Sequence, residues 1–122
     1  MTLTERLRKL FTKPYATIPA SKAQELMQYR RAVLLDVRET SEWNSGHASN
    51  ARHIPLGALL GRLGELPNGR PVVAVCQSGL RSARAARLLA GHGYEVYNLR
   101  GGMRAWTGAG LPVKGAGARR TR

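Results

Sequence analysis

The feature that most constrains the fold of this chain is a pair of short apolar runs. Each run is followed directly by a charged or reactive residue. Residues 32–35 are wholly apolar and end at Asp36, and residues 72–75 are wholly apolar and end at Cys76. Such short runs without polar alternation predict strands that are buried on both faces. Helical segments separate them, so the pattern predicts a parallel, doubly wound α/β sheet. Ligands of such sheets bind at the carboxyl ends of the strands, where Asp36 and Cys76 stand.

Shorter segments complete this α/β pattern. Residues 82–90 form the strongest helical pattern, with alanines on one face, and Gly91 and Gly93 end it. A short helix or turn is expected at residues 40–43. In all, the sequence predicts a sheet of about five mostly parallel strands flanked by helices. Further strands are expected at residues 16–18, 53–55 and 96–99, and further helices after Pro19, over residues 56–63 and around residues 103–106.

Charge and composition divide the 122 residues into one domain with two basic ends. The formal charge is +13, of which segment 1–13 carries +3 and segment 114–122 carries +4. Segment 1–13 is amphipathic and predicts a helix that packs on the domain or lies on a membrane surface. Segment 114–122 has no large apolar residue, which predicts a disordered tail. The domain itself is expected over residues 14–113.

The ends of the chain and the single cysteine limit location, partners and cofactors. No aromatic residues interleave with the charges of the tail, which disfavours nucleic acid as a partner. No apolar run has the length of a signal-peptide core or a transmembrane segment, so we expect a cytoplasmic protein. One cysteine excludes an internal disulfide, a CxxC redox pair and a cysteine-built zinc site. We therefore expect neither a metal nor another cofactor.

The segment from Cys76 to Ser82 is the candidate active site, because it joins a buried strand to a helix N-terminus. A tight loop in this position can direct several backbone N–H groups inward and form a site for an anion. The helix N-terminus adds partial positive charge, which makes a thiol ionise more easily. Gly79 permits a positive φ, and Arg81 adds a full charge close to the site. An inert buried cysteine is the alternative, but this combination of features favours a working thiolate.

Four blocks in order resemble the rhodanese-domain sulfurtransferases, specifically their single-domain members. The loop over residues 76–82 is similar to the active-site pattern C-x-x-G-x-R-[ST] of that family. Together the blocks cover roughly residues 16–112, and the ordered set is highly specific. The other three blocks are Leu34-Leu35-Asp36-Val37-Arg38 with Glu42-Trp43 and Gly46-His47, then residues 51–56, and then the closing run over residues 94–106.

The resemblance implies a rhodanese-like fold and a covalent mechanism centred on Cys76. Its thiolate attacks the outer sulfur of an anionic donor such as thiosulfate or a persulfide, and the Cys76 persulfide then passes that sulfur to a thiophilic acceptor. Without a second cysteine, the acceptor must be external: a thiol, cyanide or a protein. Arg81 would attract the donor. Asp36 and Arg38, from their place at a strand end near the site, are interpreted as a structural ion pair or a hydrogen-bonded brace in preference to a direct catalytic role. The substrate-binding groups would be the backbone N–H groups of Gln77, Ser78, Gly79, Leu80, Arg81 and Ser82.

Two other functions remain as alternatives. Phosphatases and arsenate reductases of related fold resemble this loop but have five residues between cysteine and arginine, whereas four residues, 77–80, intervene here. The shorter loop favours sulfur over a tetrahedral oxyanion. A non-catalytic persulfide carrier or partner-binding module is the second alternative, which a complete loop around Cys76 disfavours. The sequence leaves the physiological donor, the acceptor and the oligomeric state open.

Overall fold

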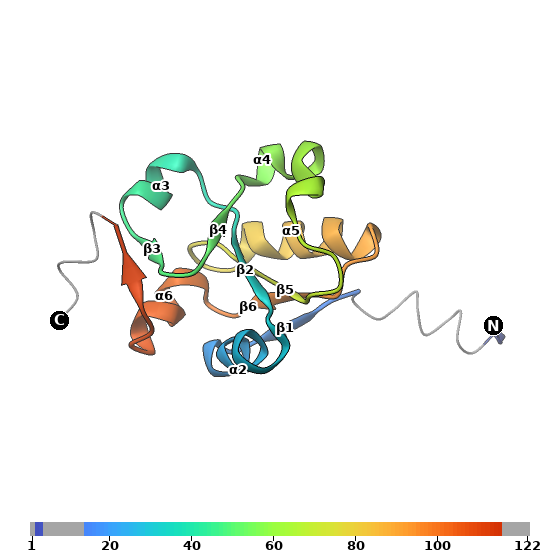
Figure 1. The fold of residues 1–122 in the computed structure, drawn as a ribbon, viewed down its shortest axis with the longest axis horizontal. Helices are drawn as coiled ribbons and strands as arrows, with labels where there is room; N and C mark the ends of the chain where they lie inside the picture. Colours follow the sequence, from blue (N-terminus) through green and yellow to red (C-terminus); the bar gives the residue numbers. More distant parts are fainter. Residues whose placement is uncertain (1, 4–13, 116–122) are drawn as a thin grey trace.

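The computed structural model describes residues 2–3 and 14–115. In this part of the chain, five parallel strands form one sheet in the order β1-β6-β5-β2-β4 (Figure 1). The two apolar runs of the sequence occupy adjacent central positions of this sheet, which confirms the predicted fold class. The strands are β1 (Ala16–Ile18), β2 (Val33–Asp36), β4 (Arg52–His53), β5 (Val72–Val75) and β6 (Val96–Leu99).

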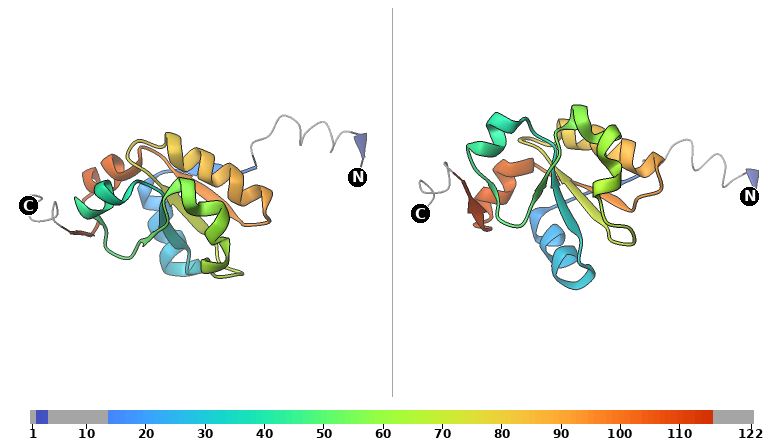
Figure 2. Two further views of the ribbon diagram at one scale, coloured as in Figure 1. Left: turned by 90° about the horizontal axis from the view of Figure 1, so that it is seen from above. Right: turned by 45° about the horizontal axis from the view of Figure 1, so that its top comes forward.

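Helices cover both faces of the sheet, as a doubly wound fold requires (Figures 1 and 2). One face packs against α2 (Ala20–Arg30) and α6 (Gly102–Gly108). The other packs against α4 (Leu56–Leu59), the 3-10 segment η1 (Leu60–Glu65) and α5 (Leu80–Gly91). Successive side chains of β5 alternate between the two cores, with Val72 and Ala74 on the α5 side and Val73 and Val75 on the other. A strand buried on both faces explains the unbroken apolar run.

A second, two-stranded sheet lies beside the main one and was not expected from the sequence. The helix α3 (Thr40–Asn44) leads into β3 (His47–Ala48), which pairs antiparallel with β7 (Val113–Lys114). Lys114, assigned by the sequence to the disordered tail, therefore belongs to a strand and lies opposite His47. Apart from Thr2 and Leu3, the predicted N-terminal helix lies outside the described residues, and so does the predicted tail after Gly115.

Three predicted boundaries differ from the structure. The strand expected at residues 53–55 is Arg52–His53, because Ile54 packs into the core and Pro55 is the N-cap of α4. The helical stretch expected over residues 56–63 divides into α4 and η1. Inside η1, the non-helical backbone of Arg62 interrupts the turn. The helix expected at residues 82–90 begins at Leu80 and extends to Gly91, so its N-terminus lies inside the candidate loop.

None of the helices in the described part of the chain has the length and apolar character needed to cross a membrane.

Candidate active site

Cys76 lies at the carboxyl end of β5, and the first turn of α6 holds it there. The backbone N–H of Met103 donates to Cys76 O at 2.8 Å, and that of Arg104 donates to Gln77 O at 3.4 Å. The two chain segments approach so closely that position 102 must be glycine. A Cβ on Gly102 would lie 2.6 Å from the carbonyl carbon of Gln77 and closer still to Cys76 O, and its φ is +56°. The pair Gly101-Gly102 thus fixes the base of the loop.

Two hydrogen-bond donors lie close to the Cys76 sulfur. The backbone N–H of Gly79 donates to Cys76 Sγ at 3.0 Å, and the Ser82 hydroxyl lies 3.2 Å from Sγ. Gly79 has a φ of +113°, as the loop position predicted from the sequence requires. Cys76 has 1% of its surface exposed, so the sulfur lies at the bottom of the loop. A reacting group must therefore be slender enough to enter between these donors.

The pKa of the Cys76 thiol lies below its ordinary value. Burial alone raises the pKa of this thiol, because it removes water from the charged form. Hydrogen bonds from the Ser82 hydroxyl and from the backbone N–H groups of Ser82, Gly79 and Ser78 outweigh burial and favour the thiolate. The N-terminus of α5, a helix of 12 residues, stands behind the same sulfur and acts in the same direction. The loop is built to hold a negative sulfur.

Asn98 supports this arrangement from the neighbouring strand β6, and sequence reasoning missed it. Its Oδ1 lies 2.6 Å from Ser82 Oγ, and its Nδ2 donates to Gly79 O at 3.2 Å. Ser82 carries one hydroxyl proton, so it donates either to Asn98 or to the sulfur at any moment. Asn98 is buried, and a buried amide in a short strand that otherwise packs apolar groups was the available signal. It holds both donors to the sulfur in place.

Asp36 and Arg38 form the buried ion pair that the sequence predicted. Arg38 Nε lies 3.0 Å from both carboxylate oxygens of Asp36, and its Nη2 lies 2.8 Å from Oδ2. The same guanidinium donates to Gly46 O at 2.8 Å and to Gln77 Oε1 at 3.4 Å. The pair therefore connects the end of β2, the turn after α3 and the residue after Cys76.

Arg81 forms a two-pronged ion pair with Glu42 of α3, which the sequence did not reveal. Its Nη1 and Nη2 lie 2.5 Å and 2.8 Å from the Glu42 carboxylate oxygens. The pair lowers the pKa of Glu42 to about 2, chiefly through the hydrogen bond from Arg81, and raises the pKa of Arg81 for the same reason. The Cys76 charge also contributes to the raised pKa of Arg81, so the guanidinium lies within electrostatic reach of the sulfur. Glu42 balances much of the charge expected to attract a donor.

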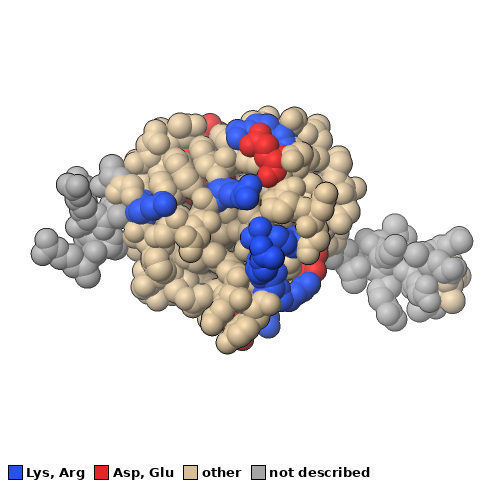
Figure 3. Space-filling view, viewed as in Figure 1, with Lys and Arg blue, Asp and Glu red and all other residues tan. Residues whose placement is uncertain are grey.

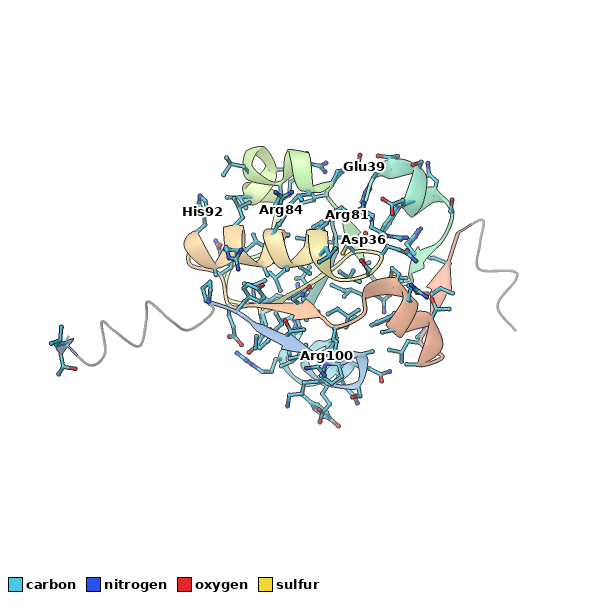
Figure 4. The ribbon with its side chains drawn as sticks, turned by 180° about the vertical axis from the view of Figure 1, so that it is seen from behind. Asp36, Glu39, Arg81, Arg84, His92 and Arg100 are labelled. Atoms are coloured by element: carbon cyan, nitrogen blue, oxygen red, sulfur yellow. The ribbon has the colours of Figure 1, made fainter. Side chains whose placement is uncertain are left out.

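The other predicted loop residues present their side chains to solvent. Gln77 and Ser78 are exposed, and Leu80, the first residue of α5, is 79% exposed. Any contact these three make with the reacting sulfur comes from their backbone. Figure 4 shows Arg81 and Asp36 at the same end of the sheet, with Arg84 further along α5 and His92 at its far end.

An aromatic stack supports the segment that carries Arg38 and Glu42. The ring of Trp43 stacks on His47 at 3.6 Å between centroids and on His53 at 4.8 Å. His47 Nδ1 is hydrogen-bonded to Trp43 O at 2.9 Å, and His53 Nε2 to Arg38 O at 2.7 Å. His47 is therefore a stacked and hydrogen-bonded residue of β3.

A groove of about 590 Å³ opens next to the loop, with Gln77, Arg38 and Glu42 at its lining. Cys76 itself does not line it. Over residues 2–3 and 14–115, no three side chains of His, Cys, Asp or Glu come together in a group that could hold a metal ion.

The fold and the loop define a class: a parallel α/β domain in which a cysteine sulfur lies at the base of a loop between a strand and a helix N-terminus, with hydrogen-bond donors close to the sulfur. The Rhodanese-like domain family matches residues 19–109, and the chain belongs to this family.

Individual relatives agree with this assignment. Thiosulfate sulfurtransferase GlpE of Vibrio cholerae is 33% identical over 98 residues, which cover 80% of this chain and 92% of GlpE. The uncharacterized protein YqhL of Bacillus subtilis is 47% identical over 81 residues, which cover 66% of this chain and 64% of YqhL, slightly under two thirds of that relative. The crystal structure of a rhodanese-related protein from Thermoplasma volcanium has a TM-score of 0.75 at 30% identity, covering 82% of this chain and 98% of that one.

Proposed function

We propose that this domain is a sulfurtransferase in which Cys76 accepts sulfane sulfur from an anionic donor, thiosulfate or a persulfide, and carries it as a persulfide. The environment of the Cys76 sulfur carries this proposal: the Gly79 N–H at 3.0 Å, the Ser82 hydroxyl at 3.2 Å and the N-terminus of α5. These groups favour a thiolate and, after transfer, an anionic persulfide. Membership of the family and the similarity to a thiosulfate sulfurtransferase support the same chemistry.

The first half-reaction forms one sulfur–sulfur bond and breaks another. The Cys76 thiolate attacks the outer sulfur of thiosulfate, the S–S bond of the donor breaks, and sulfite leaves with the electron pair. In the second half-reaction a nucleophile such as cyanide attacks the outer sulfur of the Cys76 persulfide. Thiocyanate leaves, and the electron pair of the broken S–S bond restores the Cys76 thiolate. No other protein group needs to take or give a proton.

The residues around the sulfur each have a distinct part in this proposal. The donors from Gly79 and Ser82 stabilise the negative sulfur, and Asn98 positions both of them. Arg38, neutralised by Asp36, positions Gln77 and the turn at Gly46 without adding net charge at the site. Because Cys76 is 1% exposed, only a slender group such as a terminal sulfur or cyanide reaches it.

The sulfur acceptor is external in this proposal, because the chain contains a single cysteine. The reaction also needs that cysteine as a reduced thiol, so a reducing compartment such as the cytoplasm is part of the proposal. A binding module that docks on nucleic acid has less support. On the face shown in Figure 3, lysines and arginines form separate groups divided by uncharged surface rather than one continuous basic stripe.

A non-catalytic persulfide carrier is the second candidate, favoured by the shielding of Cys76, which would protect a stored persulfide. The two candidates differ in turnover. We expect the wild-type chain to convert thiosulfate and cyanide to thiocyanate over many cycles, and Cys76→Ser to be inactive. Production of one equivalent of thiocyanate per chain, from protein loaded beforehand, followed by no further turnover would establish the carrier instead. Equal inactivity of both chains, with no sulfur added to either, would remove both candidates.

A further inference from the structure

The groove of about 590 Å³ beside the loop is not needed for the proposed reaction with thiosulfate and cyanide. Both molecules are far too small to fill it, whereas its size is typical of sites for organic ligands. Its walls come from the end of α3 with the following turn, from α6 and from β7, which lie around the same end of the molecule (Figure 1). The groove therefore offers room for a larger substrate than the small anions considered above.

The groove borders the Cys76 loop through residues of two chain segments. Gln77, the residue that follows Cys76, lines it. Met103 and Arg104 also line it, and their backbone N–H groups donate to Cys76 O and Gln77 O at 2.8 Å and 3.4 Å. A molecule seated in the groove thus lies against the residue that follows Cys76 and against the turn of α6 that holds the loop.

Among the residues that the structure describes, the charges of the groove leave one cation without an opposite charge. Three charged residues line it, namely Arg38, Glu42 and Arg104. Arg38 is paired with Asp36, and Glu42 is paired with Arg81. Arg104 is exposed and forms no ion pair with any residue that the structure describes. Met103 and Val113 add apolar surface beside it, so the groove suits a partly apolar molecule with one carboxylate.

We propose that this groove binds the sulfur acceptor, an organic thiol of low molecular weight that carries a carboxylate, with Arg104 as the partner of that carboxylate. This inference rests on the proposed function. The acceptor thiol loses its proton to solvent, and its thiolate attacks the outer sulfur of the Cys76 persulfide. The S–S bond of that persulfide breaks, its electron pair stays on Cys76 Sγ, and the acceptor leaves as an organic persulfide.

Two acceptors that differ in one group test the role of Arg104. With thiosulfate as the donor, kcat/KM is measured for 3-mercaptopropionate, which carries a carboxylate, and for 2-mercaptoethanol, which carries a hydroxyl. The ratio of the two values cancels effects on the first half-reaction. We expect Arg104→Gln to lower this ratio about fivefold, and Arg100→Gln to keep the wild-type ratio. Arg100 is an exposed arginine outside the groove, on the α2 side of the domain in Figure 4. An unchanged ratio in Arg104→Gln, or the same fall in both variants, would overturn the proposal.

Binding of a non-reactive thioether separates this proposal from the proposed function. S-methylglutathione carries carboxylates but cannot accept sulfur, so calorimetry or chemical-shift changes report its binding without turnover. We expect the wild-type chain to bind it and Gly108→Leu to lose at least tenfold in affinity. Gly108 lines the groove, and a Cβ added there meets no atom within 4 Å, so the larger side chain enters open space. Turnover with cyanide but no binding of the thioether would overturn the acceptor groove and leave the proposed function standing. Binding without any sulfur transfer would overturn the proposed function, and the groove would then be a carboxylate-binding site but not an acceptor site.

Discussion

Two regions meet at Cys76 and stabilise the site in different ways. The loop side, residues 76–82 with the first turn of α6 and Asn98, surrounds the sulfur with neutral dipoles: backbone N–H groups and a hydroxyl. The α3 side, with β2 and its following turn, contributes to two ion pairs, one of which reaches across to Arg81 of the loop side. Asp36 neutralises Arg38 and Glu42 neutralises Arg81.

The difference indicates where the negative charge on sulfur is stabilised. Fixed dipoles aimed at Sγ act at 3.0–3.2 Å, and they need no movement when the sulfur becomes charged. The paired arginines contribute little net field, and their main effect is to hold chain segments in position. We therefore expect large effects on chemistry from changes on the loop side and smaller effects from changes that break the ion pairs with the α3 side.

The largest effect is expected from Gly102→Ala on the loop side. The added methyl group would collide with the backbone of Cys76 and Gln77, and φ at this position is +56°. Strain and overpacking together should cost about 2–4 kcal/mol of unfolding free energy. Displacement of the loop should lower kcat/KM about 100-fold. Urea denaturation measures the loss of unfolding free energy, and thiosulfate turnover measures the fall in kcat/KM. Gly91→Ala, at a helical position with no atom within 4 Å of the new group, is the matched control. Equal behaviour of the two variants would mean that the close contact at α6 does not position the loop.

The next effect concerns the Ser82 hydroxyl, a single donor on the loop side. Its hydrogen bond lowers the pKa of Cys76, so Ser82→Ala should raise that pKa and leave less thiolate at neutral pH. We expect the rate of Cys76 alkylation by iodoacetamide at neutral pH to fall about tenfold, and the midpoint of its pH profile to move upward. Ser82→Thr, which keeps the hydroxyl, should retain most of the rate, and Ser21→Ala on α2 is the remote control. If the pH profile of alkylation in Ser82→Ala has the same midpoint as in the wild type, the Ser82 hydroxyl does not stabilise the Cys76 thiolate.

A smaller effect is expected from breaking the ion pair between Glu42 of α3 and Arg81. Glu42→Gln leaves the Arg81 charge unbalanced near the sulfur, so KM for thiosulfate should fall a few-fold at low salt. Arg81→Ala should raise the KM for thiosulfate by a similar factor. It should raise the KM for a neutral sulfane donor by a smaller factor. Added salt should diminish both effects, because it screens exposed charges. Equal losses of Arg81→Ala with anionic and neutral donors would show that Arg81 does not recognise the donor.

The smallest effect is the pH dependence of stability that Glu42 confers. Its pKa falls from 4.5 to about 2 in the folded chain, so the Arg81 pair stabilises the fold above about pH 4.5 and that contribution disappears as pH falls toward about 2. Because the two side chains are 30% and 35% exposed, solvent screening limits it to about 1 kcal/mol. The difference in unfolding free energy between wild type and Glu42→Gln should shrink over this pH range. A constant difference would contradict the linkage.

The main sheet was predictable because its strands have a local cause. The runs at residues 33–36 and 72–75 contain little but apolar side chains, and such runs are typical of strands that are buried on both faces. The small β3–β7 sheet was not predictable, because its two-residue strands show no periodicity and pair residues far apart in sequence. His47 meets Lys114 only after α6 has brought the end of the domain back to α3.

The same distinction applies to the site. Cys76, Gly79 and the helix after them are consecutive in sequence, so their geometry follows from local rules of loops and helix N-termini. The pairing of Arg81 with Glu42 joins residues 39 apart, and the support from Asn98 to Ser82 joins residues 16 apart. Such contacts depend on the tertiary fold. A buried asparagine beside apolar neighbours could have been suspected, but its partners could not.

Storage of sulfur on Cys76 can be measured by the intact mass of the chain after treatment with thiosulfate. The chain contains one cysteine, so added sulfur has a single expected location. We predict that the wild-type chain gains the mass of one sulfur atom, that cyanide removes it, and that Cys76→Ser gains nothing. A wild-type chain that gains no mass, or a Cys76→Ser chain that gains the same mass, would contradict the account.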